Sequence, residues 1–194
     1  SKGCAELVTT AYRNAFFKDA HTPVALASVR SGNVIGGGDW AEDRLIPDMI
    51  RGILAGEKIA IRNPQAIRPW QHVLGPLEGY LILAERLWED VPSFSEAWNF
   101  GPSDAEVMTV EEIANLVRDC WDTDISWDIS SVPHPHEAHY LRLDSSKANI
   151  RLGWRPKLPV KDAVRWTLDW YKAYMQKKNM LEFTLDQIEQ YERL

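Results

Sequence analysis

The sequence predicts an α/β fold, in which helices alternate with short buried strands. The prediction starts from a helical repeat at the beginning of the chain, where Cys4, Val8 and Tyr12 recur every four residues. A polar turn over 18–23 follows, and then an apolar run over 24–29 that has the length of a buried strand. A helix that leads directly into such a strand indicates an α/β unit.

A glycine-rich loop is expected next, over residues 32–43. It follows the carboxyl end of the predicted strand, which is where open α/β sheets bind ligands. Pro47 suits the first turn of the helix that comes after the loop, because proline lacks an N–H group that would have no partner there. That helix is expected to end near Leu54.

A helix over 73–88 is expected, with an apolar face of residues that recur every three or four positions. They are Leu77, Leu81, Ala84 and Leu87. The other expected elements are strands over 59–61, 97–100 and 125–129, and helices over 110–120, 144–152 and 160–175.

Two capping boxes mark helix starts. Thr109 and Glu112 have the spacing in which a threonine and a glutamate satisfy each other's backbone N–H groups. Thr184 and Gln187 repeat the spacing and predict the start of the last helix.

Composition limits the class of protein. The length of 194 residues allows one compact core, and no apolar run reaches the roughly 20 residues of a membrane helix. The net charge of −6 argues against a nucleic-acid binder, because contacts with phosphates need a basic face. Cys4 and Cys120 have neither the number nor the spacing of a disulfide framework or a zinc site, so a cytoplasmic protein is expected.

The start of the chain indicates part of a longer protein. Ser1-Lys2-Gly3 opens directly on the helical repeat, as if the numbering began inside a helix. The triplet Gly36-Gly37-Gly38 lacks the Gly-x-Gly-x-x-Gly spacing of a dinucleotide-binding loop. A cofactor-binding portion is therefore expected outside these 194 residues.

Several segments in chain order resemble known motifs. Ser1-Lys2-Gly3-Cys4-Ala5-Glu6 is similar to the end of the Tyr-x-x-x-Lys motif of the extended short-chain dehydrogenase/reductase family, and the segment 30–36 is similar to that family's Arg-x-x-Asn-x-Tyr/Ile-Gly motif. Segments 44–47, 67–70 and 98–101 resemble the nucleotide-binding turn, the Arg-Asp-Trp segment and the Tyr-Asn-Ile-Gly segment of the nucleotide-sugar dehydratases in this family. Pro69 stands where the usual aspartate is, so no salt bridge is expected at that position.

Four strings narrow the resemblance to members that act on CDP-sugars rather than dTDP- or GDP-sugars. They are residues 36–44, 62–64, 68–72 and 134–140. Their order and spacing, rather than any single string, carry this interpretation.

The resemblance implies a fold and a reaction. It implies the C-terminal part of a Rossmann-type doubly wound fold with a smaller substrate-binding lobe. Residues 1–30 would end the NAD-binding portion, and residues 31–194 would form most of the lobe that binds the nucleotide-sugar, with the return of some segments to the sheet left open. The implied partners are NAD, a CDP-sugar and further copies of the chain in a homodimer or homotetramer. The implied reaction is a 4,6-dehydration that serves deoxysugar synthesis, which the chain alone is expected not to perform.

The same resemblance implies the site residues. Lys2 would act in catalysis and in cofactor binding, because its charge favours a neighbouring phenolate and its ammonium can donate to ribose hydroxyls. The residues expected to contact the nucleotide-sugar are Asn33, Arg44, Leu45, Ile61, Arg68, Asn99, His136, Glu137, His139 and Tyr140.

Plainer interpretations stay open for several residues. Lys2 fits a solvated surface lysine, Asn33 a turn residue, and Arg68 a surface arginine stacked on Trp70. The histidines over 134–139 raise the question of a metal, but no cysteine or carboxylate pair completes a ligand set, and no metal is expected.

Two other functions also stay open. One is a different activity of the same family, an epimerase or reductase that acts on a related nucleotide-sugar. The other is a ligand-binding fragment that has no catalytic activity.

Overall fold

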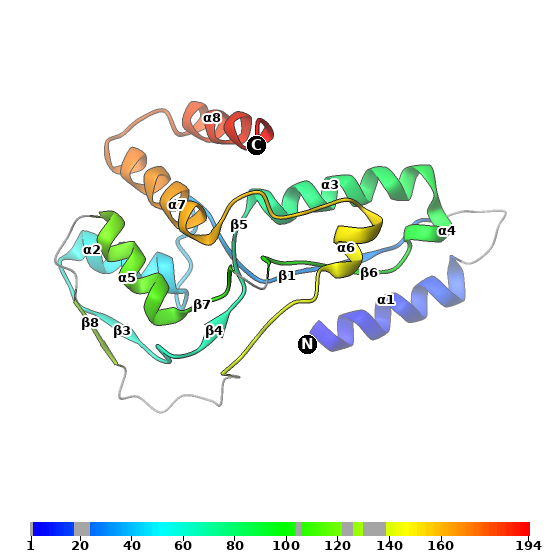
Figure 1. The fold of residues 1–194 in the computed structure, drawn as a ribbon, viewed down its shortest axis with the longest axis horizontal. Coiled ribbons are helices and arrows are strands. Elements are labelled where there is room, and N and C mark those ends of the chain that lie inside the picture. Colours follow the sequence, from blue (N-terminus) through cyan, green and yellow to red (C-terminus); the bar gives the residue numbers. More distant parts are fainter. Residues whose placement is uncertain (1, 18–23, 104–105, 122–125, 130–138) are drawn as a thin grey trace.

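The computed structural model describes residues 2–17, 24–103, 106–121, 126–129 and 139–194. Their helices and strands form two lobes, each around its own apolar core (Figure 1). The first lobe contains α1 (Lys2–Phe16), β1 (Ser28–Ser31), α3 (Leu74–Glu89), α4 (Val91–Phe94), β6 (Ala97–Phe100) and α6 (Ser146–Arg151).

The second lobe contains the remaining elements. Its strands are β2 (Asn33–Ile35), β3 (Ile59–Ile61), β4 (Ile67–Arg68), β5 (Trp70–His72), β7 (Met108–Thr109) and β8 (Trp127–Ile129). Its helices are α2 (Leu45–Ala55), α5 (Val110–Trp121), α7 (Val160–Met175) and α8 (Met180–Glu192).

The first lobe is built on a parallel pair of strands. β1 and β6 lie side by side with Arg30 opposite Asn99, and α1 and α3 cover opposite faces of the pair (Figure 1). Trp98, Phe100 and Trp154 are fully or almost fully buried between β6 and α3, and the indole of Trp154 donates to the carbonyl of Gly75 at 3.0 Å. Through this pairing β6, which comes much later in the chain, lies beside the first strand, β1.

The second lobe packs three helices around short strands. Met49 of α2, Ile113 of α5 and Leu168 of α7 are at most 1% exposed and share one core. β2 pairs in parallel with β5, and β3 with β8. Buried apolar side chains on three helices therefore hold strands that are too short to be stable alone.

Most of the predicted helices are confirmed. α1, α2, α5 and α7 match their predicted ranges within about two residues, which is the usual spread of helix ends. The capping box forms: the hydroxyl of Thr109 accepts from the N–H of Glu112 at 3.1 Å, and the Glu112 carboxylate accepts from the N–H of Thr109 at 2.7 Å. The strands over 59–61 and 97–100 are confirmed as well.

The predicted cap of the last helix is wrong. α8 begins at Met180, and the side chain of Asn179 caps it by accepting from the backbone N–H groups of Leu181 and Glu182. The hydroxyl of Thr184 donates to the carbonyl of Met180 at 2.7 Å, inside the helix. Asparagine is a stronger N-cap than threonine, so the helix starts one turn earlier.

Most of the predicted apolar face of α3 is also wrong: Leu77, Leu81 and Ala84 are exposed, and of the four predicted residues Leu87 alone packs against the core. Leu77 and Leu81 are 45% and 73% exposed, whereas Gly75, Gly79 and Leu83 are buried. Glycine on the inward side lets the ring of Phe100 approach the helix, a contact that hydrophobic periodicity does not register.

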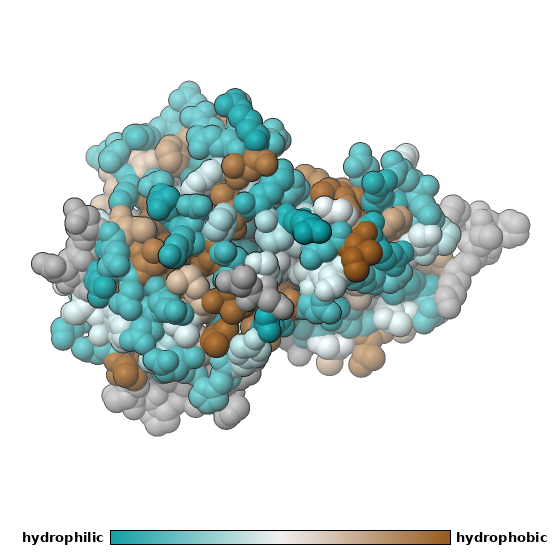
Figure 2. Space-filling model, in the orientation of Figure 1, coloured by the Kyte–Doolittle hydropathy of each residue, from teal (hydrophilic) through white to brown (hydrophobic). Residues whose placement is uncertain are grey.

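The surface of the described residues is mixed. The face drawn in Figure 2 is mostly hydrophilic, with apolar residues in small separate patches. None of the described helices combines the length and the hydropathy that a membrane span requires.

Gly79 supplies a test of the first lobe. A β-carbon at this position would lie 2.3 Å from the ring of Phe100, so Gly79→Ala in the natural full-length protein should lower the free energy of unfolding by about 1–3 kcal/mol. Gly75→Ala, on the same helix, is the matched control, because a β-carbon there meets atoms only at 3.9 Å. Urea denaturation of both variants measures the difference, and equal stabilities would contradict the packing.

Candidate functional site

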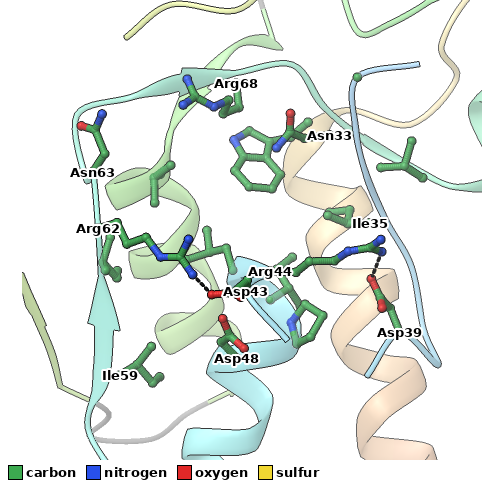
Figure 3. A pocket seen from close by; sticks show the side chains of 18 of the residues that line it. Asn33, Ile35, Asp39, Asp43, Arg44, Asp48, Ile59, Arg62, Asn63 and Arg68 are labelled. Atoms are coloured by element: carbon green, nitrogen blue, oxygen red, sulfur yellow. Dashed lines mark hydrogen bonds and ion pairs between the residues drawn. The ribbon is translucent and has the colours of Figure 1, made fainter. Parts of the chain in front are cut away.

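The main cavity lies in the second lobe and measures about 640 Å³, within the range of about 300–1,000 Å³ that is common for small-molecule pockets. Its walls come from β2, the loop after it, the start of α2, β3 with the turn that follows, and the segment around β4 (Figure 3). Five of the residues predicted to contact the substrate line it. They are Asn33, Arg44, Leu45, Ile61 and Arg68.

The glycine-rich loop forms one wall because α7 holds it. A β-carbon on Gly37 would lie 2.0 Å from the ring of Trp170, so only glycine lets this indole cover the loop. The hydroxyl of Tyr171 donates to the carbonyl of Asp39, and burial raises the pKa of this phenol to about 12. Gly37 therefore serves the packing of α7 against the loop.

Arg51 holds the same loop from α2. Its guanidinium donates to the carbonyl of Trp40 at 2.7 Å and to the carbonyl of Ala41 at 3.3 Å, and it pairs with Asp48. Desolvation by burial and the nearby Glu42 raise the pKa of Asp48, while the pairing with Arg51 acts against them. The loop is thus fastened to both neighbouring helices before any ligand binds.

The opposite wall depends on the approach of two backbone segments. The N–H of Asn33 donates to the carbonyl of Pro69 at 2.9 Å, and a β-carbon on Gly32 would lie 2.3 Å from that same oxygen. This contact brings β2 beside the segment that carries Arg68, and Figure 3 shows both side chains on one side of the cavity. Asn33 and Arg68 are therefore placed to act on the same ligand.

Charge in the cavity is balanced. Arg44 pairs with Asp39 at 2.7 Å, and Arg62 pairs with Asp43 (Figure 3). With Arg68 and Asp48, the described lining residues contribute three guanidinium groups and three carboxylates. Apolar walls from Leu45, Ile59, Ile61 and Val110 lie beside these charges, so the cavity suits a ligand with both an anionic and a flat apolar part.

Sequence reasoning missed several lining residues. Asp43, Arg62 and Asn63 line the cavity but were not predicted as contacts, whereas Trp70, which the sequence offered as a residue that could line the pocket, does line it. The signal for Arg62 and Asn63 was present, because both directly follow the predicted strand over 59–61. Trp70 is 5% exposed, and its indole N–H has no partner among the described residues.

Lys2 lies elsewhere, on the exposed side of the first lobe. α1 runs antiparallel to β1, so its first turn lies toward the carboxyl end of that strand (Figure 1). Glu6, one turn after Lys2, accepts from the hydroxyl of Ser28 at 2.7 Å and lies 3.4 Å from the guanidinium of Arg30. Lys2 therefore lies toward the carboxyl end of β1. From this end the chain continues into β2, which forms part of the cavity wall.

Asn99 is not among the residues that line this cavity. Its side-chain N–H donates to the carbonyl of Asp144 at 3.0 Å, and its buried amide oxygen has no partner among the described residues. His139 and Tyr140 are exposed and run beside β4, where the N–H of Ile67 donates to the carbonyl of His139 at 2.9 Å.

His136 and Glu137 lie outside the described residues. Among the residues that are described, no group of three His, Cys, Asp or Glu side chains is placed to hold a metal ion.

No family model matches the chain, whereas solved structures match its fold. UDP-glucuronic acid 4-epimerase from Bacillus cereus, solved with UDP-glucuronic acid and NAD, has a TM-score of 0.72 at 19% identity over 89% of this chain and 51% of its own. dTDP-glucose 4,6-dehydratase from Bacillus anthracis, solved with NAD, has a TM-score of 0.68 at 19% identity over 88% and 50%. The chain has the α/β fold of the C-terminal part of these Rossmann-type epimerases and dehydratases, as its sequence predicts.

One curated relative is much more similar in sequence. CDP-glucose 4,6-dehydratase of Salmonella typhimurium (strain LT2) is 50% identical in an alignment of 194 positions that covers 98% of this chain and 54% of the relative. The chain thus spans about half the length of that enzyme. The resemblance to the nucleotide-sugar dehydratases is confirmed.

His72, which ends β5 beside the cavity wall, gives a pH test. The residue is 4% exposed, and burial lowers its pKa from 6.5 to about 4. Between pH 6.5 and about pH 4 this histidine binds a proton in the unfolded chain but not in the folded chain. The free energy of unfolding therefore decreases as the pH falls through this range, by up to about 3 kcal/mol. Above pH 6.5 the residue contributes no pH dependence.

His72→Gln should remove this part of the pH dependence, since glutamine does not titrate. Urea denaturation at several values between pH 4 and pH 7.5 compares the variant with the wild type. Parallel curves would show that His72 is protonated as easily in the folded protein as in the unfolded one.

Proposed function

We propose that this chain forms the nucleotide-sugar-binding part of an NAD-dependent CDP-glucose 4,6-dehydratase. The observation that carries the proposal is the convergence of Asn33, Arg44, Leu45, Ile61 and Arg68 on one cavity, in a chain that is 50% identical to such an enzyme over 98% of its own length. The reaction is oxidation of the C4 hydroxyl, loss of water across C5 and C6, and return of the hydride to C6.

The charged side of the cavity would hold the diphosphate. A guanidinium donates two parallel hydrogen bonds to phosphate oxygens, and Arg68 enters the cavity beside Asn33, whose amide can donate to a phosphate or a sugar hydroxyl. Arg44 adds positive charge from the loop side. Leu45 and Ile61 would contact the base and the ribose from opposite walls.

The cofactor would be held mainly outside the described residues. The exposed ammonium of Lys2, near the carboxyl end of β1, fits a donor to the nicotinamide ribose, but the described glycine-rich loop is filled by Trp170 and offers no cradle for a pyrophosphate. NAD, when bound, would accept and return the hydride. Lys2 would lower the pKa of a tyrosine placed beside it and so favour proton removal from the sugar hydroxyl.

The remaining predicted contacts stay proposals. The buried amide oxygen of Asn99, which has no partner among the described residues, is proposed to accept from the ligand. His139 and Tyr140 continue into Leu141, which lines the cavity, so the segment 136–140 is proposed to close over the base and ribose. His136 and Glu137 would act from that segment.

A second copy of the chain is proposed to bind at α1. Leu7, Val8, Tyr12 and Phe16 on this helix are each more than half exposed, which is unusual for a set of large apolar residues on one helix. Burial of these residues in a homodimer or homotetramer would stabilise the helix that carries Lys2. A cytoplasmic location, expected from the sequence, stays a prediction.

An epimerase of the same fold is the second candidate. It is favoured by one observation: UDP-glucose 4-epimerase from Thermotoga maritima, solved with UDP-glucose, matches 90% of this chain with a TM-score of 0.71 at 19% identity. The two candidates differ in product, because an epimerase returns an intact hexose while a dehydratase loses water.

Turnover tests the proposal directly. The natural full-length protein, incubated with NAD and CDP-glucose, should form a 4-keto-6-deoxy product that absorbance and mass spectrometry detect. The isolated 194-residue chain should show neither turnover nor measurable NAD binding in calorimetry, because the described residues provide no phosphate cradle. A C4 epimer without loss of water would favour the second candidate.

Arg68 tests the phosphate contact. Arg68→Lys replaces a planar fork by a point charge, so CDP affinity in the full-length protein should fall by about ten- to a hundred-fold, or roughly 1.5–3 kcal/mol. The melting temperature should change little, because the side chain is half-exposed. Wild-type CDP affinity together with a lowered melting temperature would instead assign Arg68 a packing role.

A further inference from the structure

One ion pair connects the two walls of the cavity. Arg62 follows β3, and its guanidinium extends to Asp43, which lies just before α2 (Figure 3). The other pairs in this region are local: Arg44 binds Asp39 in the same loop, and Asp48 binds Arg51 one turn along the same helix. Only the pair of Arg62 and Asp43, among these three, crosses the space that a ligand would occupy.

Stability does not account for this pair. The side chains of Arg62 and Asp43 are 39% and 75% exposed, and such surface pairs contribute only about 0–1 kcal/mol. Asp43 has a φ of 63°, in the left-handed region, which costs a residue other than glycine on the order of 1 kcal/mol. Aspartate adopts this backbone more readily than most residues, so the position allows a carboxylate, and the weak pair that it forms leaves that carboxylate open to a ligand.

The two side chains offer complementary hydrogen-bonding groups. An ionised carboxylate only accepts, and a guanidinium only donates, through five N–H groups. The contact with Asp43 is made through one terminal nitrogen of Arg62, so further N–H groups remain for a ligand. A molecule in the cavity would thus meet an acceptor beside a donor.

The pyrimidine bases differ in this pattern. Cytosine carries a donor, the N4 amino group, next to an acceptor, N3. Uracil carries the reverse, with O4 as an acceptor next to the N3–H donor. An aspartate accepts well from the N4 group of cytosine, and a guanidinium donates well to ring nitrogens.

We infer that Asp43 and Arg62 together select a cytosine base, with Asp43 accepting from N4 and Arg62 donating to N3. The inference rests on the proposed nucleotide site. Uracil would bring its O4 against the carboxylate and its N3–H against the guanidinium, which leaves both pairs unsatisfied. A base whose edge matches the donor and the acceptor should bind about ten- to a hundred-fold more tightly than a base whose edge does not.

Asp48 is the carboxylate that α2 itself contributes to the cavity lining. Arg51, on the same helix, already binds it and also holds the loop over 40–41. The donor beside Asp48 therefore comes from its own helix and not from the opposite wall. For this reason we assign Asp48 no part in base selection.

The experiment compares CDP with UDP in the natural full-length protein by calorimetry. The two ligands share the ribose and the diphosphate, so the ratio of their affinities isolates the base. The wild type should prefer CDP by about ten- to a hundred-fold. Asp43→Asn should lower this ratio by about tenfold, mainly through tighter UDP binding, because a carboxamide can present either its oxygen or its NH₂ group.

Asparagine also tolerates the left-handed backbone, so Asp43→Asn should keep the fold. Asp39→Asn is the matched control: it removes the same charge from the same cavity, and it should shift the CDP and UDP affinities together while the ratio stays at the wild-type value. Asp48→Asn should behave like this control.

The outcomes separate the inference from the proposed function. Full wild-type preference in Asp43→Asn, or loss of preference in Asp48→Asn instead, would overturn the role of Asp43. Equal affinities of the wild type for CDP and UDP would overturn base selection while the nucleotide site stands. A wild type that binds neither ligand would refute the proposed function, and this inference with it.

Discussion

The packing of Trp170 over Gly37 is the contact on which the cavity depends. The indole lies where any β-carbon at position 37 would be, and its N–H donates to the hydroxyl of Thr184 at 2.9 Å. A chain of contacts thus runs from α8 through α7 to the loop and the cavity wall. A larger residue at position 37 would move the loop and, with it, the carboxylates of Asp39 and Asp43.

The link between the lobes has a similar origin. β1 ends at Ser31 and β2 begins at Asn33, so one glycine separates the strand of the first lobe from the wall of the cavity. Gly32 passes so close to the carbonyl of Pro69 that no side chain fits between them. This close approach places the amide side chain of Asn33 and the guanidinium of Arg68 within one site, directly after the strand β1 of the first lobe.

Electrostatics in the cavity fit the proposed anionic ligand, although the chain as a whole is acidic. The net charge is −6, but three guanidinium groups gather at one place, two of them positioned by carboxylates from the loop. Local potential rather than net charge determines the binding of a small ligand. Because both pairs are partly exposed, their contribution to folding is small, and their main effect is to orient donors before a ligand arrives.

The sequence by itself determined most of the helices and predicted a nucleotide-sugar site. The periodicity that predicted α1, α2, α5 and α7, the capping box at Thr109 and the position of Pro47 are local signals that matched the structure. The apolar face predicted for α3 and the capping box predicted at Thr184 did not match it. The motifs around Asn33 and Arg68 indicated a nucleotide-sugar site, and both residues line the cavity.

The tertiary structure decided what depends on distant partners. Strands of two or three residues, such as β4, carry no period of their own and exist only because another segment pairs with them. The inward face of α3 is formed by Gly79 and Leu83 against the ring of Phe100, and not by the predicted Leu77 and Leu81. The pair of Arg62 and Asp43 joins residues from different elements, and local sequence patterns carry no information about such a contact, because it forms only when the two walls fold against each other.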